Sequence, residues 1–136
     1  MREILFRGKA ACGAWVQGDL IHRKIWKSEF EVIRVDDSGF DNYQEYEVST
    51  DTIGQYTGLT DKNGKKIFEG DIISTDIKRP YLIVEFRDGC FMFNCNDGGE
   101  DYYDIMLPIC KEAHTEYEYG EIIGNIHDNK ELLEVK

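Results

Sequence analysis

The chain has 136 residues, and its 41% hydrophobic and 12% aromatic residues suffice for one compact domain with a core of its own. Acidic residues outnumber basic ones by 27 to 16, and the resulting net charge of −11 disfavours phosphates and anionic lipids as partners. Cationic or neutral partners are favoured, although an acidic surface also serves solubility alone.

Neither a membrane span nor a secreted disulfide framework is predicted. No apolar run approaches the roughly 20 residues of a membrane helix, and residues 1–6 lack the pattern of a signal peptide. Four cysteines are irregularly spaced, without the close pairs that structural zinc requires: Cys12, Cys90, Cys95 and Cys110. We therefore expect a protein of a reducing cytoplasm with reduced, buried or half-buried cysteines, no metal and no cofactor.

The first 50 residues predict a meander of short antiparallel strands. Strands are expected at residues 3–7, 14–17, 20–22 and 30–35. A glycine-rich turn at residues 8–13 and a second at Gly18-Asp19 would separate the first three. Residues 36–44 begin with side chains that close turns by hydrogen bonding, so we expect a surface loop there.

Residues 52–73 give the clearest local prediction. Asn63-Gly64 lies between two β-prone flanks, and both residues tolerate the positive φ of a tight turn, which predicts a β-hairpin. Gly70-Asp71 is then expected to reverse the chain. Asn63, Gly64, Gly70 and Asp71 are therefore interpreted as structural turn residues, not as a phosphate-binding loop, because no helix follows them.

The rest of the chain predicts further strands at residues 72–75, 81–86, 90–94 and 121–126. Asp128 and Glu131 have the spacing of a capping box, which predicts a short C-terminal helix. Short strands joined by tight turns must curl or close to remove their edges. We therefore expect one mainly β domain over residues 1–136, with an SH3-like β-barrel at 51–136 and an irregular acidic insertion at about 95–119.

Three segments of the sequence resemble the YopX family. The first is Arg2-Glu3-Ile4-Leu5-Phe6-Arg7-Gly8-Lys9 with Trp15-Val16 and Gly18. The second runs from Ile53-Gly54-Gln55-Tyr56-Thr57-Gly58-Leu59 through Asp61-Lys62-Asn63-Gly64 to Phe68-Glu69-Gly70-Asp71-Ile72, and the third is Ile123-Gly124-Asn125-Ile126. The resemblance implies a phage or prophage origin and a β-rich fold with an SH3-like barrel, but no established activity.

The function predicted from these features is a non-enzymatic protein–protein interaction module. Tyrosines among carboxylates suit an interface, because tyrosine offers apolar area and a hydroxyl at low ordering cost. The candidate partner-binding residues are Asp97, Glu100, Asp101, Tyr102, Tyr103, Glu116, Tyr117 and Tyr119. The expected partner is a protein of host or phage origin, although the same residues would also make an ordinary wet surface.

Two other functions remain open. Surface carboxylates could hold a divalent ion in a metal-assisted hydrolase, or the acidic surface could mimic DNA and inhibit a host DNA-binding protein. We also expect a homo-oligomer, because a chain this short leaves apolar strands such as residues 81–86 to be covered by a second copy.

We predict that the isolated protein does not bind duplex DNA measurably at roughly 150 mM salt. The net charge is −11, and Lys62, Lys65 and Lys66 form only a small basic patch at the hairpin tip, so repulsion exceeds the gain from counterion release. A gel-shift titration measures this. A shift that disappears when these three lysines are changed to alanine would contradict the prediction and reveal a focused basic face.

Overall fold

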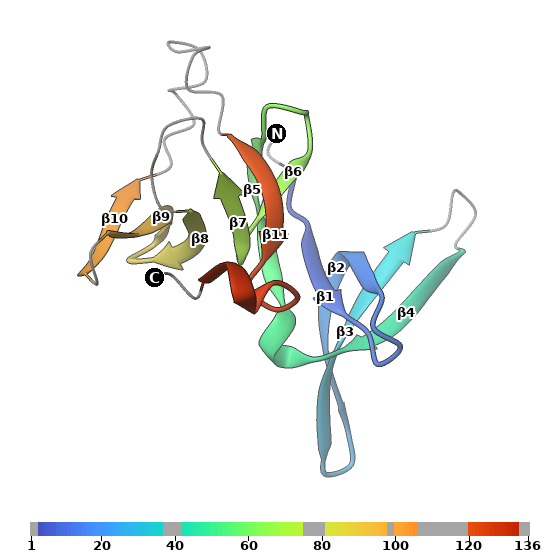
Figure 1. Ribbon diagram of the computed structural model, residues 1–136. Coiled ribbons are helices and arrows are strands. Elements are labelled where there is room, and N and C mark those ends of the chain that lie inside the picture. The colour runs from blue at the N-terminus through green and yellow to red at the C-terminus, as the bar shows by residue number, and fades with distance from the viewer. Residues whose placement is uncertain (1–2, 37–41, 75–80, 98–99, 106–119, 134–136) are drawn as a thin grey trace. The chain divides into compact units, whose positions relative to one another are not determined.

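The computed structural model describes residues 3–36, 42–74, 81–97, 100–105 and 120–133, and it is mainly β (Figure 1). The described strands form two antiparallel sheets. The chain divides into two compact units, Met1–Tyr56 and Thr57–Lys136, and the boundary falls within one strand. None of the described helices has the length and apolar character needed to cross a membrane.

The first unit is the predicted meander. Its strands lie in the order β4-β3-β2-β1-β5, and the short 3₁₀ helix η1 leads into β5. Their bounds are β1 Phe6–Lys9, β2 Trp15–Ile25, β3 Ser28–Asp36, β4 Tyr43–Val48, η1 Thr50–Thr52 and β5 Gly54–Thr60. Buried Val32, Ile33 and Val48 supply its apolar centre.

The turn predicted at Gly18-Asp19 is wrong, because β2 runs through both residues without a break. A Cβ built on Gly18 would lie 2.0 Å from the main-chain oxygen of Arg34 in β3. Glycine is therefore required here by the close approach of a neighbouring strand, which is the other common reason for glycine inside a strand. The two short strands expected on either side are one long strand.

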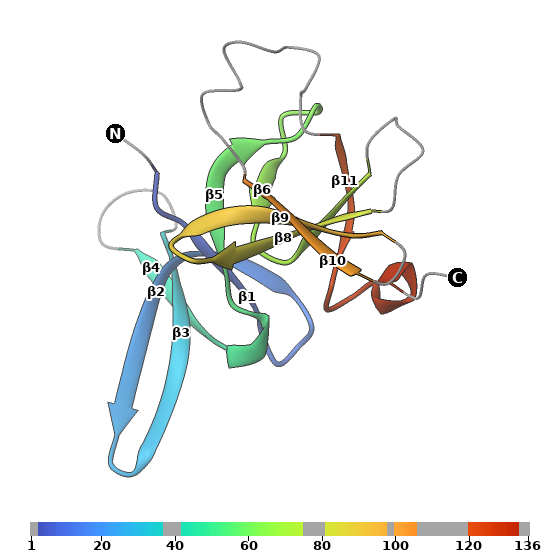
Figure 2. The same ribbon diagram turned by 90° about the vertical axis from the view of Figure 1, so that its left-hand side faces the viewer.

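The long strand creates a two-stranded extension in the first unit. β1 pairs with residues 15–18 of β2, and the pairing of β4 with β3 begins at Glu31. The segment 23–30 between them pairs only with itself among the described strands, through Arg23 with Phe30 and Ile25 with Ser28. We call this segment the 23–30 ribbon; Figure 2 shows it extending beyond β1 and β4.

The second unit contains the end of β5 and all later elements. The β5–β6 hairpin accompanies a five-stranded sheet of order β10-β9-β8-β7-β11. The bounds are β6 Lys66–Phe68, β7 Asp71–Ser74, β8 Leu82–Arg87, β9 Cys90–Asp97, β10 Glu100–Ile105, β11 Glu121–Asn125 and η3 Lys130–Leu133. Leu59 and Ile67 of the hairpin form one buried cluster with Ile73, Val84 and Phe93 of the sheet.

Several expectations for this unit require correction. The described sheets do not close into a barrel, so the SH3-like barrel is not confirmed. The predicted C-terminal helix is a four-residue 3₁₀ turn, η3, and the Asp128 carboxylate accepts a hydrogen bond from the Asn125 side chain. Strands β9 and β10 occupy the first part of the expected irregular insertion, while residues 106–119 lie outside the described residues.

The strand expected to support oligomerisation does not lie at an edge. Residues 82–87 form β8, which pairs with β7 on one side and with β9 on the other. β9 pairs with the whole length of β8, whereas β7 pairs only with Leu82 and Ile83, so β8 is an inner strand of the sheet. Homo-oligomerisation itself stays a prediction.

The Asn63-Gly64 hairpin is confirmed, but its turn differs in detail. Gly64 N–H donates to the Asp61 carbonyl at 3.0 Å, and Asp61 N–H donates to the Lys65 carbonyl at 2.8 Å. Gly64 has φ of 80°, whereas Asn63 does not have a positive φ. This is the three-residue hairpin loop in which a type I turn is followed by a left-handed glycine.

We predict that Gly64→Val lowers the free energy of unfolding by roughly 1–3 kcal/mol. A Cβ at this position would meet no atom within 4 Å, so the loss comes from the left-handed backbone alone. Gly64→Asn is the matched control, because asparagine tolerates this conformation and should retain more of the stability. Equal denaturant midpoints for the valine variant and the wild type would show that the turn is not under this constraint.

Candidate functional site

Three polar residues of the 53–72 segment are buried. These residues are Thr57, Asp61 and Asp71, and Asp71 is only 1% exposed. Buried polar groups without partners are costly, so each requires either internal hydrogen bonds or a functional explanation. Their contacts therefore decide whether this segment is a chemical site.

Asp61 accepts three hydrogen bonds from main-chain amides. Its Oδ1 accepts from Asn63 N–H and Lys65 N–H, both at 2.9 Å, within the β5–β6 loop. Its Oδ2 accepts from Ile122 N–H of β11 at 3.1 Å. Lys62 N–H donates to the Gly120 carbonyl at 3.0 Å beside it. One carboxylate thus fixes the hairpin loop and joins it to the strand 61 residues later.

The ionised form of Asp61 is favoured despite burial. Desolvation alone would raise the pKa of this carboxyl, since the side chain is 5% exposed. The hydrogen bonds from Ile122, Lys65 and Asn63, together with the Lys65 charge, outweigh that effect and hold the pKa below its usual value. Such a carboxylate is a poor general acid or base at neutral pH.

Thr57 and Asp71 have comparable structural roles. Thr57 Oγ1 donates to the Ile67 carbonyl at 2.9 Å across the β5–β6 hairpin. Asp71 Oδ2 accepts from Phe68 N–H at 2.8 Å and so closes the turn between β6 and β7. Gly70, with φ of 93°, provides the left-handed position of that turn, as expected. The polar residues of this segment stabilise the fold.

The acidic-aromatic residues predicted to bind a partner are only partly described. Asp97 ends β9, and residues 100–103 belong to β10, whose register places Glu100 opposite Asp97 and Tyr103 opposite Asn94. The backbone therefore brings Asp97, Glu100, Asp101, Tyr102 and Tyr103 into one hairpin. Glu116, Tyr117 and Tyr119 lie outside the described residues. Their role in binding stays a prediction.

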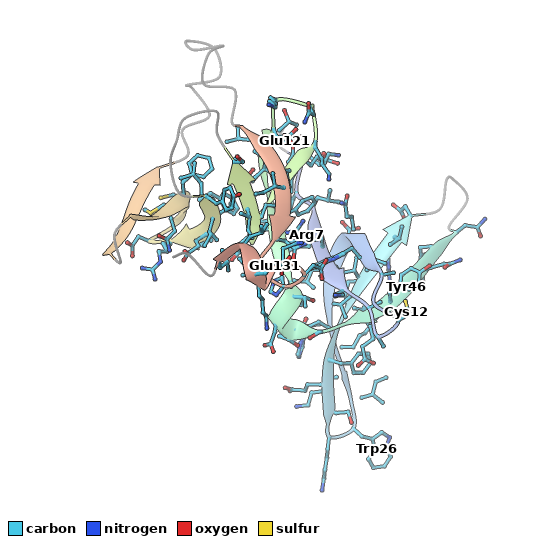
Figure 3. The ribbon with its side chains drawn as sticks, viewed as in Figure 1. Arg7, Cys12, Trp26, Tyr46, Glu121 and Glu131 are labelled. Carbon is cyan, nitrogen blue, oxygen red and sulfur yellow. The ribbon has the colours of Figure 1, made fainter. Side chains whose placement is uncertain are left out.

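The end of the 23–30 ribbon exposes apolar side chains. Trp26 is 92% exposed and Ile25 is 57% exposed, and Figure 3 shows Trp26 at the turn of the ribbon, away from the other strands of its unit. Trp26 also has φ of 56°, a left-handed conformation that is rare for a bulky residue. Exposure and an unfavourable backbone conformation coincide at one residue.

Ion pairs stabilise the base of the ribbon. Arg23 and Arg34 both donate to Glu45 Oε2, at 2.5 Å and 2.8 Å, and the Arg34 guanidinium lies 4.0 Å from the centre of the Tyr43 ring. The hydrogen bonds from Arg34, and then Arg23, lower the pKa of Glu45. The shared carboxylate thus links β2, β3 and β4 at the base of the ribbon.

A second pair on the neighbouring strands is weaker. His22 Nδ1 lies 2.6 Å from Glu31 Oε1, and this hydrogen bond is the main reason that the pKa of His22 is raised. Both groups contact solvent, so the pair adds little to stability.

The described part of the chain has no candidate metal site, and Cys12 and Cys90 are free thiols. No group of three or more histidine, cysteine or acidic side chains is arranged to hold a metal ion there. Cys12 is exposed, which corrects the expectation of a buried or half-buried thiol, whereas Cys90 is half-buried. Its Sγ contacts the Arg87 carbonyl at 3.5 Å.

Sequence reasoning did not identify the ribbon turn. Trp26-Lys27 contains none of the glycine, asparagine or aspartate residues that mark a two-residue hairpin turn. The available signal was indirect: alternating residues before Ile25 and after Ser28 are compatible with two strands, and a tryptophan lies between them.

Comparisons with known proteins identify a family and a fold. The family model described as YopX protein matches residues 5–134, nearly the whole chain. A crystal structure of protein EF1440 from Enterococcus faecalis is similar, with 24% identity and a TM-score of 0.55. The match covers 98% of this chain and 100% of that one. At this identity the similarity shows the fold alone. No curated protein matches the sequence.

We predict that Asp61→Ala lowers the free energy of unfolding by about 2–4 kcal/mol, because three amides lose their acceptor. The folded-state pKa of Asp61 is depressed, so its contribution is complete above the unfolded value of about 3.9 and is lost as pH falls through the folded one. The difference in unfolding free energy from wild type should therefore shrink below about pH 4. Denaturant titrations at several pH values measure it.

The control for this prediction is Asp51→Ala, since Asp51 is an exposed aspartate of η1. Its substitution should change neither the stability at neutral pH nor the acid dependence. If both alanine variants unfold like the wild type, the Asp61 hydrogen bonds do not carry the stability assigned to them.

Proposed function

The chain belongs to the YopX family, and from this premise we propose that it is a non-enzymatic protein-binding module of phage or prophage origin. Its anchor is Trp26, at the turn of the 23–30 ribbon. The partner is a protein of the host or of the phage, met in the bacterial cytoplasm. The family resemblance supports the origin, and the geometry of the ribbon supports the binding.

The observation that carries the proposal is the unfavourable state of Trp26 in the free protein. A non-glycine residue in the left-handed region costs roughly 1–2 kcal/mol. A tryptophan side chain that stays in water also lacks the stabilisation that burial would give. Burying about 150–250 Å² of its surface at about 25 cal/mol per Å² contributes about 4–6 kcal/mol. Trp26 is 92% exposed and has φ of 56°. The folded protein therefore gains no burial energy from this ring and also bears the cost of its backbone conformation. Burial of the ring against a partner would recover the larger of the two.

The ribbon also holds the backbone of the Trp26 turn in a defined position. Main-chain pairing from Arg23 with Phe30 to Ile25 with Ser28 holds the turn, and the Glu45 ion pairs stabilise its base. A backbone that is already ordered loses less conformational entropy on binding. Tryptophan is among the residues that contribute most to interface energies, and exposed Ile25 enlarges the apolar area.

The buried polar residues of the 53–72 segment support a role without catalysis. Thr57, Asp61 and Asp71 are engaged by main-chain groups, and the pKa of Asp61 lies below its usual value. A catalytic carboxyl would need to face substrate and to exchange a proton near neutral pH. The most distinctive segment of the sequence is thus better explained by folding than by chemistry.

We predict that Trp26→Ser abolishes capture of the partner. Full-length protein is immobilised and exposed to extracts of a bacterial host with and without induced phage, and retained proteins are quantified by mass spectrometry. Phe86→Ser is the matched control, because Phe86 is also exposed, at 49%, but lies in β8. A partner should be retained by the wild type and the control, and lost with Trp26→Ser.

The captured protein is then purified and its affinity measured by calorimetry. Trp26→Ser should weaken binding by at least about 30-fold, the loss typical of an interface hot spot. Equal affinities for the wild type and Trp26→Ser would contradict the proposal. So would the absence of any protein whose retention depends on Trp26.

A further inference from the structure

We propose that the 23–30 ribbon docks into an apolar pocket of its protein partner that is bordered by carboxylates. The inference rests on the proposed function and adds the chemistry of the receiving surface. It follows from the charged residues that surround Trp26, which are mainly basic in a chain whose net charge is negative.

The ribbon is a locally basic part of an acidic protein. It carries Arg23, Lys24 and Lys27 against the single acid Glu29, whereas the whole chain has a net charge of −11. Arg23 is engaged by Glu45, and Lys24 lies 3.8 Å from Glu29 with both side chains largely in water. Lys27, next to Trp26, has no ion-pair partner among the described residues.

Because the ribbon is long, the charges near its turn dominate the electrostatic interaction with a partner surface at the turn. The last β3–β4 pair is Glu31 with Val48, and three further residue pairs precede the turn. At about 3.3 Å per residue the turn lies about 10 Å beyond that pair, which exceeds the screening length of about 8 Å at physiological salt. The partner surface at the turn therefore meets Lys24 and Lys27 before it meets the acidic strands.

An anionic membrane fits this surface less well. Interfacial tryptophan and lysine are compatible with a lipid headgroup region, but stable attachment needs several basic residues or a large apolar face. The ribbon offers Trp26 and Ile25 as exposed apolar side chains and two exposed lysines. The remaining strands of a chain with net charge −11 would be repelled by the same headgroups.

Nucleic acid fits less well for a related reason. Binding driven by counterion release requires contacts with several phosphates, whereas Arg23 and Lys24 already lie beside carboxylates and only Lys27 has no ion-pair partner in the ribbon. A protein pocket needs only one or two carboxylates at its rim to match Lys24 and Lys27. The centre of such a pocket takes the indole ring, in the usual arrangement of an apolar interface core and a polar rim.

Two double charge reversals with the same change in net charge test the inference. Lys24→Glu with Lys27→Glu reverses the turn, while Lys62→Glu with Lys130→Glu reverses two exposed lysines of the second unit. Both variants are first checked for unchanged melting temperature. Their affinities for the purified partner captured through Trp26 are then compared at roughly 50 and 300 mM salt, which brackets the screening at physiological ionic strength.

The ribbon reversal should weaken binding by at least about tenfold at the lower salt, and the control should stay within about twofold. The wild-type affinity should fall as salt rises. Similar losses in both variants would show that only the overall charge matters, and an unchanged affinity in the ribbon variant would show that the pocket has no acidic rim. Either result overturns the inference.

Binding to vesicles containing anionic lipid and to duplex DNA is measured in parallel with the same proteins. Wild-type binding to either probe that is lost in the ribbon reversal would assign the ribbon to that surface and overturn the inference. The proposed function fails separately, if Trp26→Ser leaves partner binding intact. If Trp26 is required but Lys24 and Lys27 are not, only the inference fails.

Discussion

A single buried carboxylate, that of Asp61, joins two segments of the second unit, the β5–β6 loop and β11. It fixes the β5–β6 loop through Asn63 and Lys65, and it receives Ile122 N–H from β11. The same hairpin contributes Leu59 and Ile67 to the core shared with the five-stranded sheet. Because β11 pairs with β7 at the edge of that sheet, the Asp61 hydrogen bond holds the hairpin in the position that covers the apolar face.

The distinctive residues of the two units differ in how they are used in the free protein. In the second unit the polar residues of the family-like segment are buried and bonded, and their pattern is explained by turns and by main-chain hydrogen bonds. In the first unit the 23–30 ribbon leaves a tryptophan in water. Groups that stabilise a fold are satisfied internally, whereas groups kept for a partner remain unsatisfied in the free protein. This contrast is the basis of the proposed function.

Local chemistry made part of the fold predictable. Asn63-Gly64 and Gly70-Asp71 mark turns by their backbone preferences, and both turns are present. The turn predicted at Gly18 was wrong because a glycine in a strand and a glycine in a turn look the same in sequence. Only the close approach of the Arg34 main chain in β3 distinguishes them. Whether the strands close into a barrel could not be predicted, because closure depends on how strands that are distant in sequence meet.

The candidate site was harder to predict than the fold. The acidic tyrosine segment was singled out by composition, which says nothing about exposure. The turn at Trp26 lacks the usual turn residues, so no local sequence signal marks it. Asp61 illustrates the same limit: its carboxylate was part of a recognisable motif, but its contact with Ile122 spans 61 residues and becomes visible only in the folded chain.

Fluorine NMR of protein labelled with 5-fluorotryptophan tests the central claim most directly, because the chain has only two tryptophans, Trp15 and Trp26. Trp15→Phe assigns the two resonances, and the solvent isotope shift between H₂O and D₂O reports the exposure of each ring. The account predicts that the Trp26 resonance has the full isotope shift in the free protein and loses it when the partner binds, while Trp15 changes little. A Trp26 resonance that keeps its isotope shift in the complex would contradict the claim that this ring is the anchor.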